Sequence, residues 1–166
     1  YSEIIADMAQ LCRELFTQLG IGEGDIGKIG IGTPGSLDIE NGIVIYMNNV
    51  NFSNVNFRKE LGKFFDIPVF IDNDANCAAL GESISGACRN AENSVTITLG
   101  TGIGGGIIIG GKIYSGSFSC GGEIGHTVIV HNGRECTCGR KGCFEAYCSA
   151  SALVKRAREI AESEKD

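Results

Sequence analysis

The sequence predicts a mixed α/β fold, because helical and strand-like patterns alternate along its 166 residues. Some expected strands are short, continuous apolar runs of the kind that parallel sheets bury, whereas others are arranged as hairpins. Two dipeptides, Asn41-Gly42 and Gly110-Gly111, separate pairs of apolar segments in the manner of two-residue hairpin turns. Helices together with both kinds of strand favour α/β over an all-α or all-β fold.

The first element is expected to be an amphipathic helix. Apolar residues recur at helical spacing from Ile4 to Leu19, and Gly20 provides a C-terminal stop. The elements expected next are a strand at 28–33 that ends at Pro34-Gly35, a hairpin of strands 37–40 and 43–46, a helix at 57–65, a buried strand at 68–72 and a helix at 74–85.

The second half is expected to start with a strand at 94–99, followed by a glycine-rich loop at 100–106. A hairpin of strands 107–109 and 112–114, a strand at 127–130, and a final helix capped by Ser151 and running to Glu162 should come next. The polar run 89–93 is the best boundary between lobes. We therefore expect domains at 1–92 and 93–166.

The charge of the chain argues against contact with nucleic acid. Its 14 Lys and Arg residues are outnumbered by 20 Asp and Glu residues, for a net charge of -6, whereas binding to phosphate backbones needs clustered basic residues. No apolar run approaches the roughly 20 residues of a membrane-spanning helix. We expect a cytoplasmic protein without membrane contact, and the absence of an initial Met suggests a piece of a longer chain.

One imidazole and three thiols lie close together in the sequence, at His126, Cys136, Cys138 and Cys143. Four nitrogen and sulfur ligands are the set that structural zinc sites use, and glycines between cysteines allow the chain to turn tightly. The alternatives are buried thiols that happen to cluster or a disulfide knot. The spacing favours zinc, and the other cysteines (Cys12, Cys77, Cys88, Cys120 and Cys148) are expected to be inert thiols.

The glycine-rich segment has two interpretations. Gly100, Gly102 and Gly105 form a GxGxxG pattern, but a dinucleotide-binding fingerprint should open a helix, and this segment leads into an apolar strand and a hairpin. It is either a strand-loop-strand cradle whose backbone N–H groups approach phosphate oxygens or a flexible turn. The hydroxyl of Thr101 and five glycines in seven positions favour the cradle.

A second polar cluster, Asp72-Asn73-Asp74, directly follows an apolar strand. Ligands often bind at the carboxyl ends of strands in open α/β sheets. Asp74 is either the N-cap of the next helix or a base that accepts the proton of an attacking hydroxyl group. Two further carboxylates, Glu123 and Glu145, flank the predicted zinc ligands and can act as hydrogen-bond acceptors around the metal, as solvated charges or as ligands for sugar hydroxyls.

Taken in order, these motifs resemble the ROK family of bacterial repressors and sugar kinases, which have the actin-like ATPase (ribonuclease H-like) fold. The resemblance covers about Gly30 to Ala150. The segments that carry it are Gly32-Thr33-Pro34-Gly35, Asn73-Asp74-Ala75-Asn76, Ala78-Ala79-Leu80-Gly81-Glu82, Leu99 to Gly106, Glu123-Ile124-Gly125-His126 and Cys136 to Glu145.

The resemblance implies an ATP-dependent hexose kinase, glucokinase-like, in which Asp74 is the general base for the sugar 6-hydroxyl group. Sugar binding would fall to Gly35, Asn49, Asn73, Asp74, Glu123, His126 and Glu145. Phosphate binding would fall to Gly100, Thr101, Gly102, Ile103 and Gly104. Mg²⁺ would arrive with ATP, zinc would be structural, and we also expect a homodimer.

The family's first phosphate loop, an Asp-x-Gly-Gly-Thr hairpin, and its later adenine-binding segments are missing from this chain. We therefore expect a fragment that spans the junction of two lobes and is inactive alone. The alternative to a kinase is the sugar-sensing part of a ROK repressor whose DNA-binding domain lies upstream. An intact Asn73-Asp74 segment and the glycine-rich loop favour the kinase. The sequence does not identify the hexose.

Overall fold

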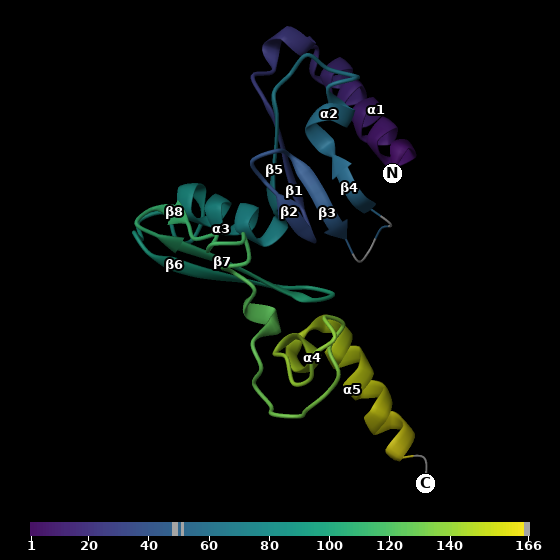
Figure 1. The fold of residues 1–166 in the computed structure, drawn as a ribbon, viewed down its shortest axis with the longest axis vertical. Helices are drawn as coiled ribbons and strands as arrows, with labels where there is room; N and C mark the ends of the chain where they lie inside the picture. The colour runs from purple at the N-terminus through teal and green to yellow at the C-terminus, as the bar shows by residue number, and fades with distance from the viewer. Residues whose placement is uncertain (48–49, 51, 165–166) are drawn as a thin grey trace. The chain divides into compact units, whose positions relative to one another are not determined.

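The computed structural model describes residues 1–47, 50 and 52–164, and it confirms the mixed α/β class (Figure 1). The chain divides into two compact units, Tyr1–Asp74 and Ala75–Asp166. The domain division expected at residues 92 and 93 concerns the organisation of the whole protein and stays a prediction.

The first unit begins with the expected amphipathic helix, α1 (Ser2–Leu19), whose buried residues are Ile5 and Ala9. Gly20 ends it with a φ of 65°, in the left-handed region where a glycine has no steric penalty. A short 3₁₀ turn, η1 (Glu23–Asp25), follows. The local signals of apolar spacing and a terminal glycine were therefore sufficient to place this helix.

A two-stranded parallel sheet forms the part of this unit that leads to Asp74. Strand β1 (Ile29–Thr33) pairs with β5 (Val69–Asn73), with Ile29 opposite Val69 and Thr33 opposite Asn73. Both strands were expected within one residue at each end. Since parallel neighbours need a long crossover connection, the segment between them contains the other three strands and a helix.

The crossover contains an antiparallel sheet in the order β2-β3-β4, made of β2 (Ser36–Asp38), β3 (Ile43–Met47) and β4 (Phe52–Asn56). The expected two-residue turn at Asn41-Gly42 is wrong. Asp38 pairs with Ile43, so four residues form the loop. The Asp38 carboxylate accepts hydrogen bonds from the side chain (2.8 Å) and backbone N–H (3.0 Å) of Asn41, which lower the pKa of Asp38.

Strand β4 was not expected, because asparagines interrupt its apolar pattern, although Phe52 and Val55 are buried. Helix α2 (Phe57–Leu61) is shorter than the helix predicted at 57–65. Its N-cap is Asn56, whose side chain accepts a hydrogen bond from Lys59 N at 2.8 Å. Gly62 follows its last residue, and the chain then continues in turns.

A single apolar cluster holds the first unit together, drawn from α1, α2 and both sheets. Its aromatic rings meet edge to face, with centroids 6.0 Å apart for Phe16 and Phe65 and 5.8 Å apart for Phe52 and Phe57. The buried members of the cluster are Ile5, Ala9, Leu37, Val44, Met47, Phe52, Val55, Phe57, Leu61, Phe65, Ile67, Val69 and Ile71.

The second unit is built around an antiparallel sheet in the order β6-β7-β8, made of β6 (Ser94–Leu99), β7 (Ile103–Ile109) and β8 (Lys112–Ile113). The predicted strand at 94–99 is confirmed at both ends. The two-residue turn at Gly110-Gly111 is also confirmed, with φ values of 58° and 72°. The predicted glycine-rich loop at 100–106 is too long, because β7 already begins at Ile103.

Helix α3 (Asp74–Ser85) matches the prediction at both ends and packs on β7 through small residues. A Cβ atom added at Gly104 would lie 2.8 Å from Ala75 Cβ, and one added at Gly106 would lie 2.4 Å from Ala79 Cβ. These two glycines are therefore strand residues that allow the helix to approach closely, and they do not belong to a flexible loop.

After β8 the chain has little regular structure until its last two helices. A 3₁₀ turn, η2 (Ile124–His126), comes first, and the strand expected at 127–130 is wrong, because the segment makes only an isolated bridge between Val128 and Cys143. Helix α4 (Glu145–Cys148) was not expected. The cap of α5 (Ala150–Ser163) is Ser149, which accepts from Ala152 N, and not Ser151. None of the helices in the described residues could cross a membrane.

Leu61 anchors α2 in the core of the first unit and is only 2% exposed. We expect Leu61→Ala to lower the free energy of unfolding by about 2–5 kcal/mol, because it removes buried methyl groups and leaves a cavity. Leu11→Ala, at a position of α1 that is 58% exposed, should change it by about 0.5 kcal/mol or less. Equal urea unfolding curves for the two variants would contradict this packing.

Candidate functional site

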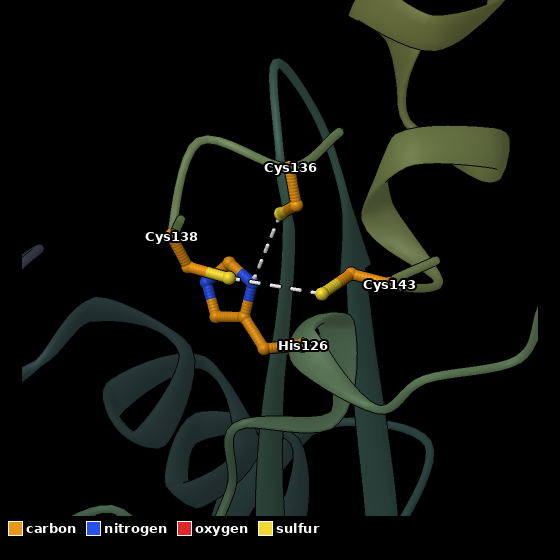
Figure 2. A group of neighbouring side chains, drawn as sticks. All are labelled: His126, Cys136, Cys138 and Cys143. Carbon is orange, nitrogen blue, oxygen red and sulfur yellow. Dashed lines mark hydrogen bonds between the residues drawn. The ribbon is translucent and has the colours of Figure 1, made fainter. Parts of the chain in front are cut away.

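His126, Cys136, Cys138 and Cys143 converge in the second unit, as Figure 2 shows. His126 ends the 3₁₀ turn η2, and Cys143 precedes α4 by two residues. Between them the chain folds back on itself: Cys136 N donates to Arg140 O at 2.9 Å, and Gly139 N donates to Cys136 O at 3.0 Å. Gly139 has a φ of 85°, which glycine adopts without strain.

The ligand atoms of these four residues lie within 4.8 Å of one another. Cys138 Sγ and Cys143 Sγ are 3.7 Å apart, and Cys136 Sγ lies 3.5 Å from His126 Nδ1. Zinc bonds of about 2.3 Å to sulfur and about 2.0–2.1 Å to nitrogen, at tetrahedral angles, give about 3.75 Å between sulfurs and about 3.55 Å between sulfur and nitrogen. The four residues therefore fit one tetrahedral metal ion of this size.

A disulfide does not explain the cluster, because its sulfurs would be about 2.05 Å apart. The thiols also differ electrostatically. Burial raises the pKa of Cys138, but hydrogen bonds from the backbone and side chain of Arg140 outweigh this effect and lower the pKa to about 6. At the fully buried Cys143, burial and contacts with the other two thiols raise the pKa to about 11. A cation at the centre would offset the cost of making Cys143 a thiolate.

The imidazole of His126 has two distinct neighbours. Nδ1 faces the cysteine sulfurs, whereas Nε2 lies 3.9 Å from Glu123 Oε2. A histidine that binds a metal through one ring nitrogen generally directs the other toward a partner. Glu123 is the nearest carboxylate to Nε2 among the described residues, at a distance longer than a hydrogen bond, and its side chain is half exposed.

Glu145 lies beside the same four residues, with its Oε1 3.9 Å from Cys136 Sγ. Its Oε2 accepts a hydrogen bond from Ile103 N at 2.9 Å, and its Oε1 accepts one from Thr137 Oγ1 at 3.3 Å. The carboxylate therefore joins the segment from Cys136 to Cys143, which we call the cysteine loop, to the first residue of β7. No sequence signal predicted this pairing, because Ile103 lies far from Glu145 along the chain.

The loop between β6 and β7 has three residues, Gly100, Thr101 and Gly102, which we call the glycine hairpin. It is closed by a 3.0 Å hydrogen bond from Gly100 N to Gly102 O, and Gly100 O accepts from Ala150 N at 2.9 Å. Ile103 begins β7, and Gly104 lies within that strand. An open pocket of about 690 Å³ adjoins the hairpin; its lining includes Thr101, Ala150, Val154, Lys155, Arg158 and Glu159.

Other predicted site residues lie in the first unit. Asn73 ends β5 and Asp74 is the exposed first residue of α3. Gly35 has a φ of 98° between β1 and β2, and a Cβ atom there would collide with Tyr46 O. Asn49 lies outside the described residues.

Two residues of the cysteine loop were given no role by sequence reasoning. Arg140 donates to His126 O at 3.1 Å and lowers the pKa of Cys138, and Thr137 supports Glu145. Both lie between the predicted metal ligands in the sequence, and this position was the sequence signal that they could support the site. Their partners become evident only once the loop has folded.

The sequence matches the model of the ROK family over residues 3–166. A glucokinase of Thermotoga maritima is 42% identical over 154 residues, which are 92% of this chain and 48% of that protein. A xylose repressor of Bacillus subtilis is 40% identical over 131 residues, which are 78% of this chain and 34% of that protein. The chain thus spans about half or less of the length of the curated relatives it matches.

Solved structures of ROK family proteins also resemble this chain. A ROK hexokinase from Thermus thermophilus superposes with a TM-score of 0.83 at 34% identity, covering 98% of this chain and 53% of that one. A ROK family glucokinase from Streptomyces griseus, solved in complex with glucose and AMPPNP, superposes with a TM-score of 0.79 at 34% identity, covering 95% of this chain and 50% of that one.

Proposed function

This chain belongs to the ROK family and has the actin-like ATPase fold of its sugar kinases, and from that premise we propose that it is part of an ATP-dependent hexose kinase. The observation that carries the proposal is the 42% identity to a glucokinase over 92% of the chain. The glucokinase from Streptomyces griseus, which was solved with glucose and an ATP analogue, supports the same substrates here.

We assign the role of general base to Asp74. A carboxylate is exposed there, at the carboxyl end of the parallel strand β5, where α/β folds commonly bind ligands. In this role Asp74 accepts the proton of the sugar 6-hydroxyl group as that oxygen attacks the γ-phosphoryl group of ATP. The alternative role as an N-terminal helix residue is compatible with catalysis, since the carboxylate is exposed.

The remaining roles follow the family resemblance residue by residue. Sugar hydroxyls would be held by Gly35, Asn49, Asn73, Glu123, His126 and Glu145, and ATP phosphates by the backbone of Gly100 to Gly104. Of the latter, Gly100, Thr101 and Gly102 offer loop backbone, whereas Gly104 lies in β7. Mg²⁺ would neutralise the phosphates. A cytoplasmic homodimer is the form we propose.

We propose that the metal of the four-ligand cluster is zinc and that its role is structural. The ligand set of one nitrogen and three sulfurs and the distances of 3.5 and 3.7 Å support this assignment. All four tetrahedral positions would be filled by protein, which leaves none for substrate. His126 can contribute to the metal site and to the sugar site, since Nδ1 faces the sulfurs and Nε2 lies near Glu123.

The second candidate function is sugar sensing by a ROK repressor. The 40% identity to a xylose repressor favours it. In a repressor, the sugar-binding residues would remain useful, whereas a general base and a phosphate-binding loop would not be needed. The presence of both Asp74 and the glycine hairpin leads us to place the kinase first.

The zinc proposal predicts about one zinc ion per chain in protein purified without chelators, from the count of tetrahedral ligands. Cys138→Ser should lower both the zinc content and the melting temperature, because metal binding is coupled to folding. Cys148→Ser, at an exposed thiol outside the cluster, is the control and should change neither. Elemental analysis that finds no bound metal would exclude the site.

For the kinase, the full-length protein should phosphorylate at least one hexose in a panel assayed with ATP and Mg²⁺. Asp74→Asn should lower kcat by about 100- to 10,000-fold while hexose binding persists, because an amide cannot accept the hydroxyl proton. Asp66→Asn, which changes an exposed carboxylate elsewhere in the first unit, should leave kcat unchanged.

Two outcomes would change this assignment. If no sugar phosphate forms and hexose binding alters affinity for an operator DNA, the protein is a repressor. If Asp74→Asn turns over at the normal rate, another group is the base.

A further inference from the structure

We propose that the Glu145 carboxylate is a positioning group that links the metal cluster to the glycine hairpin, so that metal occupancy controls the order of the hairpin. Both oxygens of Glu145 are engaged, one by Ile103 N at 2.9 Å and the other by Thr137 Oγ1 at 3.3 Å. Ile103 follows the glycine hairpin directly, and Thr137 lies between two of the cysteines. One side chain therefore contacts both segments.

The hairpin is shaped around this carboxylate. A Cβ atom added at Gly102 would approach Glu145 Oε2 to within 2.4 Å, whereas one added at Gly100 would meet nothing within 4 Å. A side chain at 102 would therefore displace the Glu145 carboxylate, whereas a side chain at 100 would not. The two glycines of one short loop provide a matched pair for experiment.

The hydrogen bond to Ile103 N is the contact through which the link acts. Ile103 is 6% exposed, and its N–H group donates to the Glu145 carboxylate in a partly buried position. A bond from a buried N–H group to a charged acceptor is stronger than a neutral one, and leaving the donor unpaired is costly. The carboxylate therefore fixes the position of the backbone at the end of the glycine hairpin.

The position of the carboxylate depends in turn on the metal ligands. Glu145 lies two residues after Cys143, and Thr137 separates Cys136 from Cys138. Metal bonds to these three sulfurs would fix the backbone on both sides of the carboxylate. Without the metal, the loop keeps its turn hydrogen bonds, the bond from Arg140 to His126 O and an ion pair between Lys141 and Glu135. The last two are exposed, and exposed contacts of this kind contribute little to stability.

This inference rests on the proposed zinc site and deepens the proposed kinase function, since the hairpin is the segment assigned to ATP phosphates. It gives the structural metal a second effect: preparing the phosphate-binding backbone. Family membership alone does not require this link, because a structural zinc ion could support only its own loop.

Hydrogen exchange of backbone amides, in the zinc-loaded and chelated protein, tests the link. Chelation should make the Ile103 amide exchange about 10- to 100-fold faster, the factor expected when a hydrogen bond to a charged group is lost. Amides of β1 and β5 in the first unit should not change. Equal acceleration of those strands would mean global unfolding and would overturn a local link.

Substitutions of single carboxylates test whether Glu145 is the group that links the metal cluster to the glycine hairpin. In Glu145→Ala, the Ile103 amide should exchange fast with or without zinc, while zinc content stays near the unmodified level. Glu135→Ala removes an exposed carboxylate of the same loop, 85% accessible, and should keep the full response to chelation. A response to chelation in Glu145→Ala equal to that of the unmodified protein would overturn the proposal.

The two hairpin glycines give a second test that needs no chelator. Gly102→Ala should accelerate Ile103 exchange in the zinc-loaded protein, because its Cβ atom displaces Glu145, whereas Gly100→Ala should not. Identical behaviour of the two variants would count against the link. Failure to find zinc would overturn both the metal site and this inference, but a protein that shows the link and phosphorylates no hexose would overturn the kinase proposal alone.

Discussion

The convergence of one imidazole and three thiols is the contact around which the segment from residue 114 to 144 is organised. From residue 114 to 144 the described chain contains one 3₁₀ turn and isolated bridges, and its buried residues are only Gly125, Gly142 and Cys143. Such a segment buries too little apolar surface to offset its loss of conformational entropy. A bound metal would supply the stabilising free energy that the small apolar core of this segment does not.

Local signals explain which elements could be predicted from sequence. The bounds of α3 and β6 were correct because apolar spacing and flanking polar residues were unambiguous. The spacing of His126, Cys136, Cys138 and Cys143 predicted that these side chains lie together, and their ligand atoms are within 4.8 Å of one another. The predicted strand at 127–130 was wrong although its residues are apolar. Val128, Ile129 and Val130 are 41–51% exposed, because the cysteine loop fixes this segment and no neighbouring strand pairs along it.

Other errors came from side chains that compete with the backbone. Asp38 binds Asn41 and draws it into a four-residue loop, so the Asn-Gly signal did not produce a two-residue turn. The glycines of the segment 100–106 were interpreted as a phosphate cradle or a flexible turn, and several of them have packing roles. Gly102 makes room for Glu145, while Gly104 and Gly106 admit α3. Composition alone cannot separate ligand approach from close packing.

Two residues of the candidate site belong to two networks at once. His126 has one ring nitrogen among the sulfurs and the other near Glu123. Glu145 accepts hydrogen bonds from Ile103 N and Thr137 Oγ1 and a longer one from Cys136 Sγ. A carboxylate offers about four lone-pair positions, so at least one remains for a sugar hydroxyl. Binding a sugar and holding the hairpin are therefore compatible roles for Glu145. It follows that a loss of activity on changing either residue identifies a sugar contact only when zinc content and hairpin order are unaltered.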